Sequence, residues 1–347
     1  MGDILHALPG VTALRIAHPD WTIDWIVEPR WRALLAVEGA IERGPAQPLI
    51  DNLHLAPTKE WRRHPFSYST RLEIKDLHAS LRASRYDAVV DLQGAIRSAV
   101  VARLAGCRRL IGEARPRELP ARWLFTEHVA TRGVHVIEQD VELVSAIGGD
   151  HLVPAKPLLP IDPEAEAWAD EVLSPKMRSG GGAQPFVLIN PGAGWGAKRW
   201  PLEKYAVIAR GLIERGCHVL VNAGPGEEPY AEALSQATGG AAIPLNCSLA
   251  QLIAVTRRVA LVIAGDTGPL HLACALGRPV VGIYGPTDPA RNGPYGTSFK
   301  VLRSPMSRRD HRRRASPEAG LLSIQPDDVL RAAEALLYPE TTPEADL

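Results

Sequence analysis

The segment that most constrains the fold of this chain is a buried apolar run that ends in Asp-Thr-Gly and leads into a helix. Residues 261–265, Leu-Val-Ile-Ala-Gly, are typical of a strand in a parallel sheet covered on both faces. Gly268 lets the backbone approach a ligand, and Pro269 suits a first helical turn. The N–H groups at such a helix start, with His271 one turn further on, favour an anion site. A tight turn with a capping Asp or Thr fits the same residues, so both interpretations stay open.

The same alternation of strand, glycine and helix recurs along the chain and predicts an α/β fold with parallel sheets. Buried strands with a glycine shortly after the tip are expected at 88–92, 186–190 and 280–284. The composition changes over 153–185, where prolines and Gly180-Gly181-Gly182 surround one short acidic helix. We therefore expect two Rossmann-like domains that face each other across a cleft. Their predicted bounds are 1–155 and 186–338, with a linker over 156–185 and a tail over 339–347.

Composition excludes several classes of protein. Lys plus Arg and Asp plus Glu both number 39, so no overall charge favours a nucleic-acid partner. The four cysteines are scattered, which argues against a disulfide framework or a zinc site and fits a reducing cytosol. No apolar run reaches the ~20 residues that span a bilayer, and the first residues do not read as a signal peptide.

The loops of the second half carry groups suited to phosphates. Gly192–Ala197 satisfies the G-x-G-x-x-G/A pattern, but Lys198 and Pro201 precede the next helix, which argues against a dinucleotide fingerprint. Lys198, the Thr267-Gly268 helix start and His271 can bind phosphates, and Glu227 is placed to hold a ribose diol. No paired carboxylates or metal-ligand cluster accompany them. The pattern predicts a nucleotide-sugar donor site whose diphosphate is neutralised by lysine and amides, without a metal or cofactor.

Three basic stretches stand apart from these loops. Residues 59–64 read as a loop that is either a solvated face or a clamp for an anionic acceptor. Residues 115–118 form a polar loop with Arg117, which suggests a second anion contact. Residues 308–314 are strongly basic, as in a mobile solvated segment or one attracted to an anionic membrane.

An ordered set of motifs resembles the ADP-heptose:lipopolysaccharide heptosyltransferase family, closest to its type I members. The set covers roughly residues 1–300. Its segments are Met1-Gly2-Asp3-Ile4-Leu5-His6-Ala7-Leu8-Pro9, Asp24-Trp25-Ile26-Val27-Glu28, Asp91-Leu92-Gln93-Gly94 with Arg97-Ser98, Lys198-Arg199-Trp200-Pro201, Asp266-Thr267-Gly268 with His271-Leu272-Ala273, and Tyr284-Gly285-Pro286-Thr287-Asp288-Pro289. The resemblance implies the GT-B arrangement and an inverting, metal-independent glycosyltransferase that moves a heptose from ADP-heptose to an anionic lipopolysaccharide core.

The resemblance also implies roles for individual residues. Asp3 matches the general base. The implied donor-binding residues are Lys198, Glu227, Asp266, Thr267, Gly268 and His271, and the implied acceptor-binding residues are Lys59, Arg62, Arg63 and Arg117. The expected partners are a nucleotide-diphosphate sugar and an anionic glycolipid, with no nucleic acid. A monomer in the cytoplasm, in peripheral contact with the inner membrane, is expected.

The chain departs from the family pattern at two positions that affect function. The loop before Lys198 is Gly-Ala-Gly-Trp-Gly where type I members more often carry hydroxyl residues. Family members have an apolar strand before the residues that match Gly2-Asp3, so we expect the first N-terminal strand to be missing. Two other functions therefore stay open: a nucleotide-sugar epimerase, which needs no acceptor, and a non-catalytic nucleotide-sugar binder.

Overall fold

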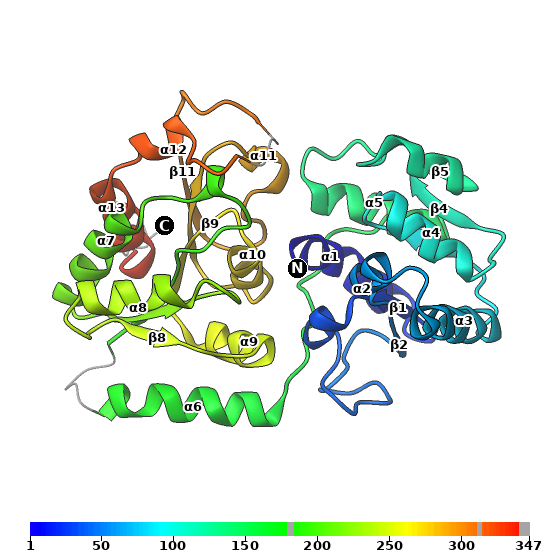
Figure 1. The fold of residues 1–347 in the computed structure, drawn as a ribbon, viewed down its shortest axis with the longest axis horizontal. Coiled ribbons are helices and arrows are strands. Elements are labelled where there is room, and N and C mark those ends of the chain that lie inside the picture. Colours follow the sequence, from blue (N-terminus) through cyan, green and yellow to red (C-terminus); the bar gives the residue numbers. More distant parts are fainter. Residues whose placement is uncertain (179–183, 311–313, 340–347) are drawn as a thin grey trace, which may run out of the picture. The chain divides into compact units, whose positions relative to one another are not determined.

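The computed structural model describes residues 1–178, 184–310 and 314–339, and its chain divides into two compact units (Figure 1). One unit comprises Asp3–Ile161 and the other begins at Asp162. The first unit has two parallel sheets and the second unit has one.

The second unit is built on a six-stranded parallel sheet of order β11-β10-β9-β6-β7-β8. Its strands are β6 (Phe186–Asn190), β7 (His218–Asn222), β8 (Ile243–Leu245), β9 (Leu261–Gly265), β10 (Val280–Tyr284) and β11 (Phe299–Arg303). The chain starts at the central β6, builds one half outward through β7 and β8, and then returns to β9 on the other side of β6. This order is that of a doubly wound dinucleotide-binding fold, with a switch point between β6 and β9.

Strands β6 and β9 are buried along their whole length, which requires that both faces of this sheet be covered. Helices provide this cover. Between the strands lie η3 (Gly196–Lys198), α7 (Leu202–Glu214), α8 (Glu228–Ala237), α9 (Leu249–Arg258), α10 (Gly268–Ala275) and α11 (Pro289–Asn292), followed by α12 (Ala319–Ser323) and α13 (Pro326–Leu337). One face packs on α7, α8 and α13, where alternate residues such as Val187 and Ile189 share a core with Ile208 and Val329. The other face packs on α10, which contacts β9 and β10.

The expected acidic helix before this sheet is longer than the sequence pattern predicts. It forms α6 (Pro163–Arg178), lies within the range expected to be a linker, and packs on α9. Glu166 pairs with both Arg257 and Arg258, and Asp170 pairs with Arg258 at 2.7 Å. These ion pairs attach α6 to α9 within the second unit.

The first unit has two parallel sheets, β1–β2 and β3–β4–β5. Its strands are β1 (Asp24–Val27), β2 (Asn52–Leu55), β3 (Val89–Asp91), β4 (Leu110–Glu113) and β5 (Glu127–Val129). Its helices are α1 (Gly2–Ala17), η1 (Pro29–Leu34), α2 (Thr58–Arg63), α3 (Tyr68–Ala83), α4 (Ile96–Leu104), η2 (Leu119–Leu124) and α5 (Val136–Gly148). The structure thus begins with α1 ahead of any strand, and hydrogen bonds do not join the two sheets within the described residues.

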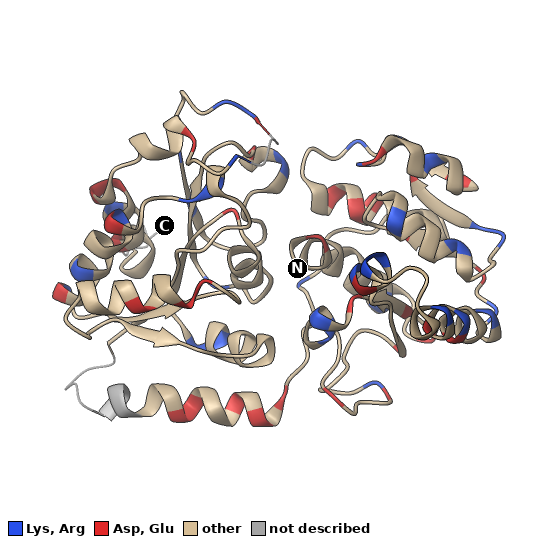
Figure 2. Cartoon of the chain, viewed as in Figure 1, with Lys and Arg blue, Asp and Glu red and all other residues tan. Residues whose placement is uncertain are grey.

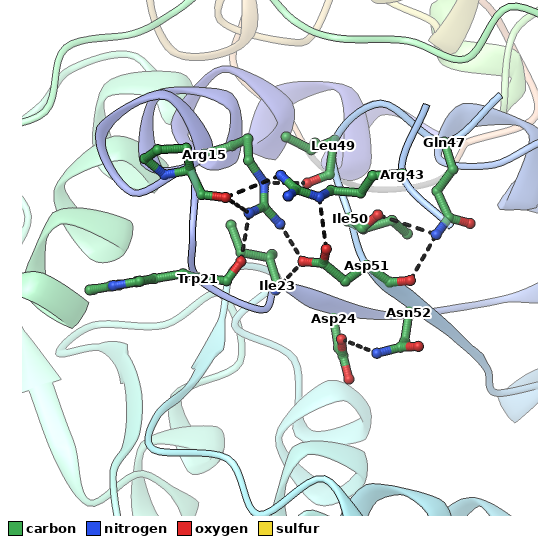
Figure 3. Close-up of polar contacts among 11 residues, drawn as sticks. Arg15, Trp21, Ile23, Asp24, Arg43, Gln47, Leu49, Ile50, Asp51 and Asn52 are labelled. Atoms are coloured by element: carbon green, nitrogen blue, oxygen red, sulfur yellow. Dashed lines mark hydrogen bonds and ion pairs between the residues drawn. The ribbon is translucent and has the colours of Figure 1, made fainter. Parts of the chain in front are cut away.

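A buried arginine fixes the end of α1 (Figure 3). The guanidinium of Arg15 donates to the carbonyl oxygens of Leu49 at 3.0 Å and Trp21 at 2.6 Å, and pairs with Asp51 at 2.5 Å. Asp51 also pairs with Arg43 at 2.9 Å. Because several partners satisfy the buried cation, α1 is tied to the segment that leads into β2, and the helix that begins at Gly2 has one defined position in its unit.

One prediction of local structure is wrong. Residues 59–64 were predicted to form a loop, but 58–63 are the helix α2. Glu60 lies in its first turn and Arg62 and Arg63 in its last, an order of charges that stabilises a helix dipole. The buried Trp61 adds packing, because it shares a core with Leu77 and Leu81 of α3.

Candidate functional site

The switch point of the second unit brings together the two loops that the sequence analysis singled out. β6 and β9 are hydrogen-bonded neighbours, with Asn190 opposite Ala264. The loop after β6 carries Lys198, and the loop after β9 begins with Asp266. In open α/β sheets a ligand binds outside the carboxyl ends of the strands at this point.

Lys198, Asp266 and His271 form one buried cluster. The Lys198 ammonium pairs with the Asp266 carboxylate and also lies 3.3 Å from the Asp266 carbonyl oxygen. The Nε2 atom of His271 is 3.1 Å from the other carboxylate oxygen. Burial by itself would raise the pKa of Asp266, but the hydrogen bond from His271 and the charge of Lys198 outweigh it and hold that pKa well below its usual range.

The ammonium of Lys198 has a second fixed neighbour. It lies 4.3 Å from the centroid of the Trp195 ring, a cation–π distance. Its side chain is 11% exposed, so the charge sits at the edge of the protein rather than in bulk water. A cation that is held in place and still partly accessible is suited to meet a phosphate.

The start of α10 follows the same loop. Thr267 is its N-cap in extended backbone conformation, and the Thr267 hydroxyl donates to the Gly265 carbonyl oxygen at 3.2 Å. This hydroxyl therefore does not cap the helix among the contacts described. The first N–H groups, from Gly268 onward, remain for an anion.

Glu227 lies at the neighbouring strand tip, after β7. Its carboxylate accepts a hydrogen bond from the Gly224 amide at 3.3 Å, and a Cβ atom at Gly192 would lie 1.8 Å from it. A side chain at position 192 would therefore make the Glu227 carboxylate move from its present position against the loop after β6. The buried Asn190 and Asn222 side chains join the two strand ends by a 2.6 Å hydrogen bond.

The candidate base belongs to a separate cluster in the first unit. Asp3, in the first turn of α1, accepts a hydrogen bond from Gln93 at 2.9 Å and pairs with Arg117 at 3.4 Å. The loops that carry these partners touch, since the Glu118 amide donates to the Gly94 carbonyl oxygen at 2.9 Å. Gly94 has φ +63°, and a Cβ atom at this position would lie 2.9 Å from the backbone nitrogen of Arg117.

Buried Asp91 holds the Gln93 loop in shape. It accepts hydrogen bonds from the amides of Gln93 and Gly94, at 2.9 Å and 3.2 Å, and from the Ser98 hydroxyl at 2.9 Å. Burial raises the pKa of Asp91, and these three donors act in the opposite direction. Asp91 and Gln93 received no role in the sequence analysis. Only the motif Asp91-Leu92-Gln93-Gly94 marked them, and the contact from Gln93 to Asp3 spans 90 residues.

The basic residues expected to bind the acceptor share α2. Glu28 accepts hydrogen bonds from the Thr58 hydroxyl and, at 3.2 Å, from the Lys59 amide, which fixes the start of the helix. Desolvation lowers the pKa of Lys59, as do the positive charges of Arg30, Arg97 and Arg63. Arg62 and Arg63 are exposed. The helix thus carries three basic residues, of which Arg63 pairs with Glu60 at 3.5 Å.

The described residues contain neither a metal-binding cluster nor a membrane-spanning helix. Their His, Cys, Asp and Glu side chains contain no group of three or more that could hold a metal ion. In the same residues every helix is too short or too polar to cross a membrane.

Comparison with known proteins identifies the family. The family model for glycosyltransferase family 9 (heptosyltransferase) matches residues 74–321, more than half of the chain. The chain belongs to this family. The resemblance found in the sequence is thereby confirmed, and the protein is a family 9 glycosyltransferase.

Relatives and solved structures extend the similarity over nearly the whole chain. Lipopolysaccharide heptosyltransferase 1 of Escherichia coli is 30% identical over 312 residues, which cover 88% of this chain and 91% of the relative. The structure of E. coli heptosyltransferase WaaC with ADP is 26% identical, covers 97% of both chains, and has a TM-score of 0.76. WaaC with ADP-2-deoxy-2-fluoro heptose, also 26% identical, covers 96% of both chains with a TM-score of 0.72. The predicted α/β fold of GT-B type is confirmed by these structures.

The basic segment 308–314 of this family 9 glycosyltransferase is described in part, because residues 311–313 lie outside the described residues. Arg309 pairs with Asp288, and Arg314 pairs with Asp310 at 2.8 Å. The Asp310 amide donates to the Pro286 carbonyl oxygen at 3.1 Å. The described part is therefore attached to the loop after β10 and is not simply a solvated run.

Proposed function

We propose that this family 9 glycosyltransferase moves a heptose from ADP-heptose to an anionic lipopolysaccharide core acceptor, with inversion and without a metal. The observation that carries the proposal is the buried cluster of Lys198, Asp266 and His271 at the switch point of the second sheet. Relatives whose names state heptosyl transfer, and WaaC structures with ADP and an ADP-heptose analogue, support the donor.

In the donor unit, Lys198 and the first amides of α10 bind the diphosphate. Asp266 holds Lys198 in place, because its pKa is held well below the usual range and its carboxylate is therefore ionised. As the bond from the anomeric carbon to the diphosphate oxygen breaks, negative charge grows on the leaving ADP. A fixed ammonium and helix-start amides stabilise that charge without a divalent cation. Glu227 accepts hydrogen bonds from the ribose hydroxyls.

In the acceptor unit, Asp3 is the general base. It removes the proton from the acceptor hydroxyl while that oxygen bonds to the anomeric carbon. Gln93 and Arg117 fix its carboxylate. Arg117 and the α2 residues Lys59, Arg62 and Arg63 bind the anionic groups of the acceptor.

The proposal also assigns a role to each segment of the chain and a location to the protein. Residues 1–155 bind the acceptor, 156–185 connect, 186–338 bind the donor and 339–347 form a tail. The protein acts as a monomer in the cytoplasm, in peripheral contact with the inner membrane where its acceptor is anchored.

Substitution of Lys198 tests the donor assignment. Lys198→Gln removes the cation and keeps a polar side chain, so ADP affinity measured by calorimetry and heptosyl transfer are both expected to fall, transfer by about 100-fold. Lys300→Gln, which changes an exposed lysine on β11, is the matched control and should leave both unchanged. Unchanged ADP affinity and transfer in Lys198→Gln would contradict the assignment.

The same assay separates the two other functions. An epimerase would convert the nucleotide sugar with no acceptor present. A non-catalytic binder would retain ADP-heptose affinity but transfer no heptose to any acceptor. The proposed transferase needs both substrates.

A further inference from the structure

Four large apolar side chains are exposed on two neighbouring elements of the first unit. Ile96 and Val100 of α4 are 41% and 49% exposed, and Leu119 and Trp123 of η2 are 58% and 81% exposed. Helix α4 packs on η2 through Ala99 and Ala102, which share a core with Ala121 and Phe125. The inner faces of both elements are thus already filled, and large parts of the outer apolar side chains remain exposed.

The charged residues within these two elements are basic, although the exposed Glu118 immediately precedes η2. Helix α4 contains Arg97 and Arg103 and no acidic residue, and η2 contains Arg122 and no acidic residue. Figure 2 shows blue and no red on α4. In a chain whose acidic and basic residues balance, an exposed tryptophan among arginines is a combination suited to the interface of an anionic bilayer.

The same surface adjoins the cluster that contains Asp3. Glu118, one residue before η2, accepts a hydrogen bond from the Ile96 amide at 2.9 Å, and the neighbouring Arg117 pairs with Asp3. A surface in this position would bring the candidate base close to an acceptor anchored in lipid.

We propose that Ile96, Val100, Leu119 and Trp123, with Arg103 and Arg122, form a docking surface for an anionic lipid bilayer. The apolar side chains enter the interface, and the guanidinium groups meet lipid phosphates. The inference rests on the proposed function only for the reason why the protein would bind a membrane. Bilayer binding itself needs neither donor nor acceptor.

Vesicle sedimentation of the full chain tests the surface. The wild type should bind equimolar phosphatidylglycerol and phosphatidylethanolamine vesicles better than phosphatidylcholine vesicles. Leu119→Ser with Trp123→Ala should weaken binding to the anionic vesicles about tenfold. Arg103→Gln with Arg122→Gln should weaken it to a similar extent and abolish the preference for anionic lipid. Ile41→Ser, at an 88% exposed isoleucine outside the surface, is the matched control and should bind as the wild type does.

A second measurement separates docking from catalysis. Transfer to a water-soluble acceptor without acyl chains should be unchanged in Leu119→Ser with Trp123→Ala, while transfer to an acceptor in anionic vesicles falls. A chain that binds vesicles through this surface but transfers no heptose would leave the inference standing and overturn the proposed function.

Three results would overturn the inference: no preference of the wild type for anionic vesicles, equal binding by the substituted variants, or loss of binding in Phe66→Ser with Tyr68→Ser instead. Phe66 and Tyr68 are the exposed aromatic residues of the α2–α3 turn and would mark a rival surface.

Discussion

At the scale of single residues, the side chains expected to do chemistry are each held by a partner that is distant in sequence. Lys198 pairs with Asp266, 68 residues away, and Asp3 contacts Gln93, 90 residues away. The first pair is buried, whereas the second lies at the surface. Water competes for the Gln93–Asp3 hydrogen bond, so this bond contributes more to the orientation of the carboxylate than to stability.

The Gln93 amide is therefore expected to position the base. Gln93→Leu should lower kcat/KM for transfer about tenfold, because an unheld carboxylate spends less time aligned with the acceptor hydroxyl. Gln93→Glu, which replaces the amide donor by a second carboxylate, should lower kcat/KM at least as much. Unchanged kcat/KM in both variants would show that Gln93 has no positioning role.

At the scale of elements, the loop that carries Lys198 depends on a later segment of the chain. The Ala197 amide donates to the Arg314 carbonyl oxygen at 3.0 Å, and the Glu318 amide donates to the Ala197 carbonyl oxygen at 3.2 Å. Between these bonds, Gly196 lies so close to Ala315 that a Cβ would be 1.7 Å from its carbonyl oxygen. The contact is with backbone atoms, which cannot move aside by a change of side-chain rotamer.

Gly196→Ala is accordingly expected to separate the two segments and move Lys198. Unfolding free energy should fall by about 1–3 kcal/mol, as in overpacked cores, and ADP affinity should fall with it. Gly194→Ala, two residues earlier at an exposed position where a Cβ meets nothing within 4 Å, is the control. Thermal unfolding and calorimetry would detect both effects, and identical behaviour of the two variants would refute the expectation.

A second dependence between elements involves Asp24, at the start of β1. Its carboxylate accepts hydrogen bonds from the Tyr86 hydroxyl at 2.6 Å and the Asn52 amide at 2.9 Å, and lies 3.3 Å from His54. Burial raises the pKa of Asp24, but these bonds outweigh it, so the pKa is lowered on folding. Asp24 then stabilises the fold above its unfolded pKa, and the contribution is lost as the pH falls through the lower, folded value.

Asp24→Asn should therefore destabilise the protein mainly at neutral pH. The expected loss is about 1–3 kcal/mol at pH 7, and the difference from the wild type should shrink below about pH 4. Urea unfolding at several pH values measures this, with Asp20→Asn at an exposed position as control. A loss independent of pH would indicate that the charge of Asp24 is not involved.

At the scale of the whole molecule, strand positions and the donor loops could be predicted because their signals are local. Apolar runs mark β6, β9 and β10, and the predicted strands 186–190 and 280–284 agree with β6 and β10 at both ends. The helical state of 58–63 could not be read in the same way, because tertiary burial of Trp61 adds to weak local preferences. The contacts of Asp3 with Gln93 and Arg117 depend on how distant loops meet, which no local pattern encodes.

The donor unit also bears on the metal requirement of the whole reaction. Lys198 and the α10 start are proposed to carry the leaving diphosphate without a metal ion. Transfer should therefore be unaffected by EDTA, measured as the initial rate with and without chelator at constant ionic strength. A rate that falls with EDTA and returns with a divalent cation would contradict the metal-independent proposal.

The most direct test of the account is transfer of heptose from ADP-heptose to a lipopolysaccharide core acceptor by the full chain, followed by mass spectrometry of the acceptor. The wild type should add one heptose in an acceptor-dependent reaction that releases ADP. Asp3→Asn should bind ADP-heptose normally and add none, and Lys198→Gln should bind it poorly. Full transfer by Asp3→Asn, or release of ADP from the wild type without modification of the acceptor, would contradict the account.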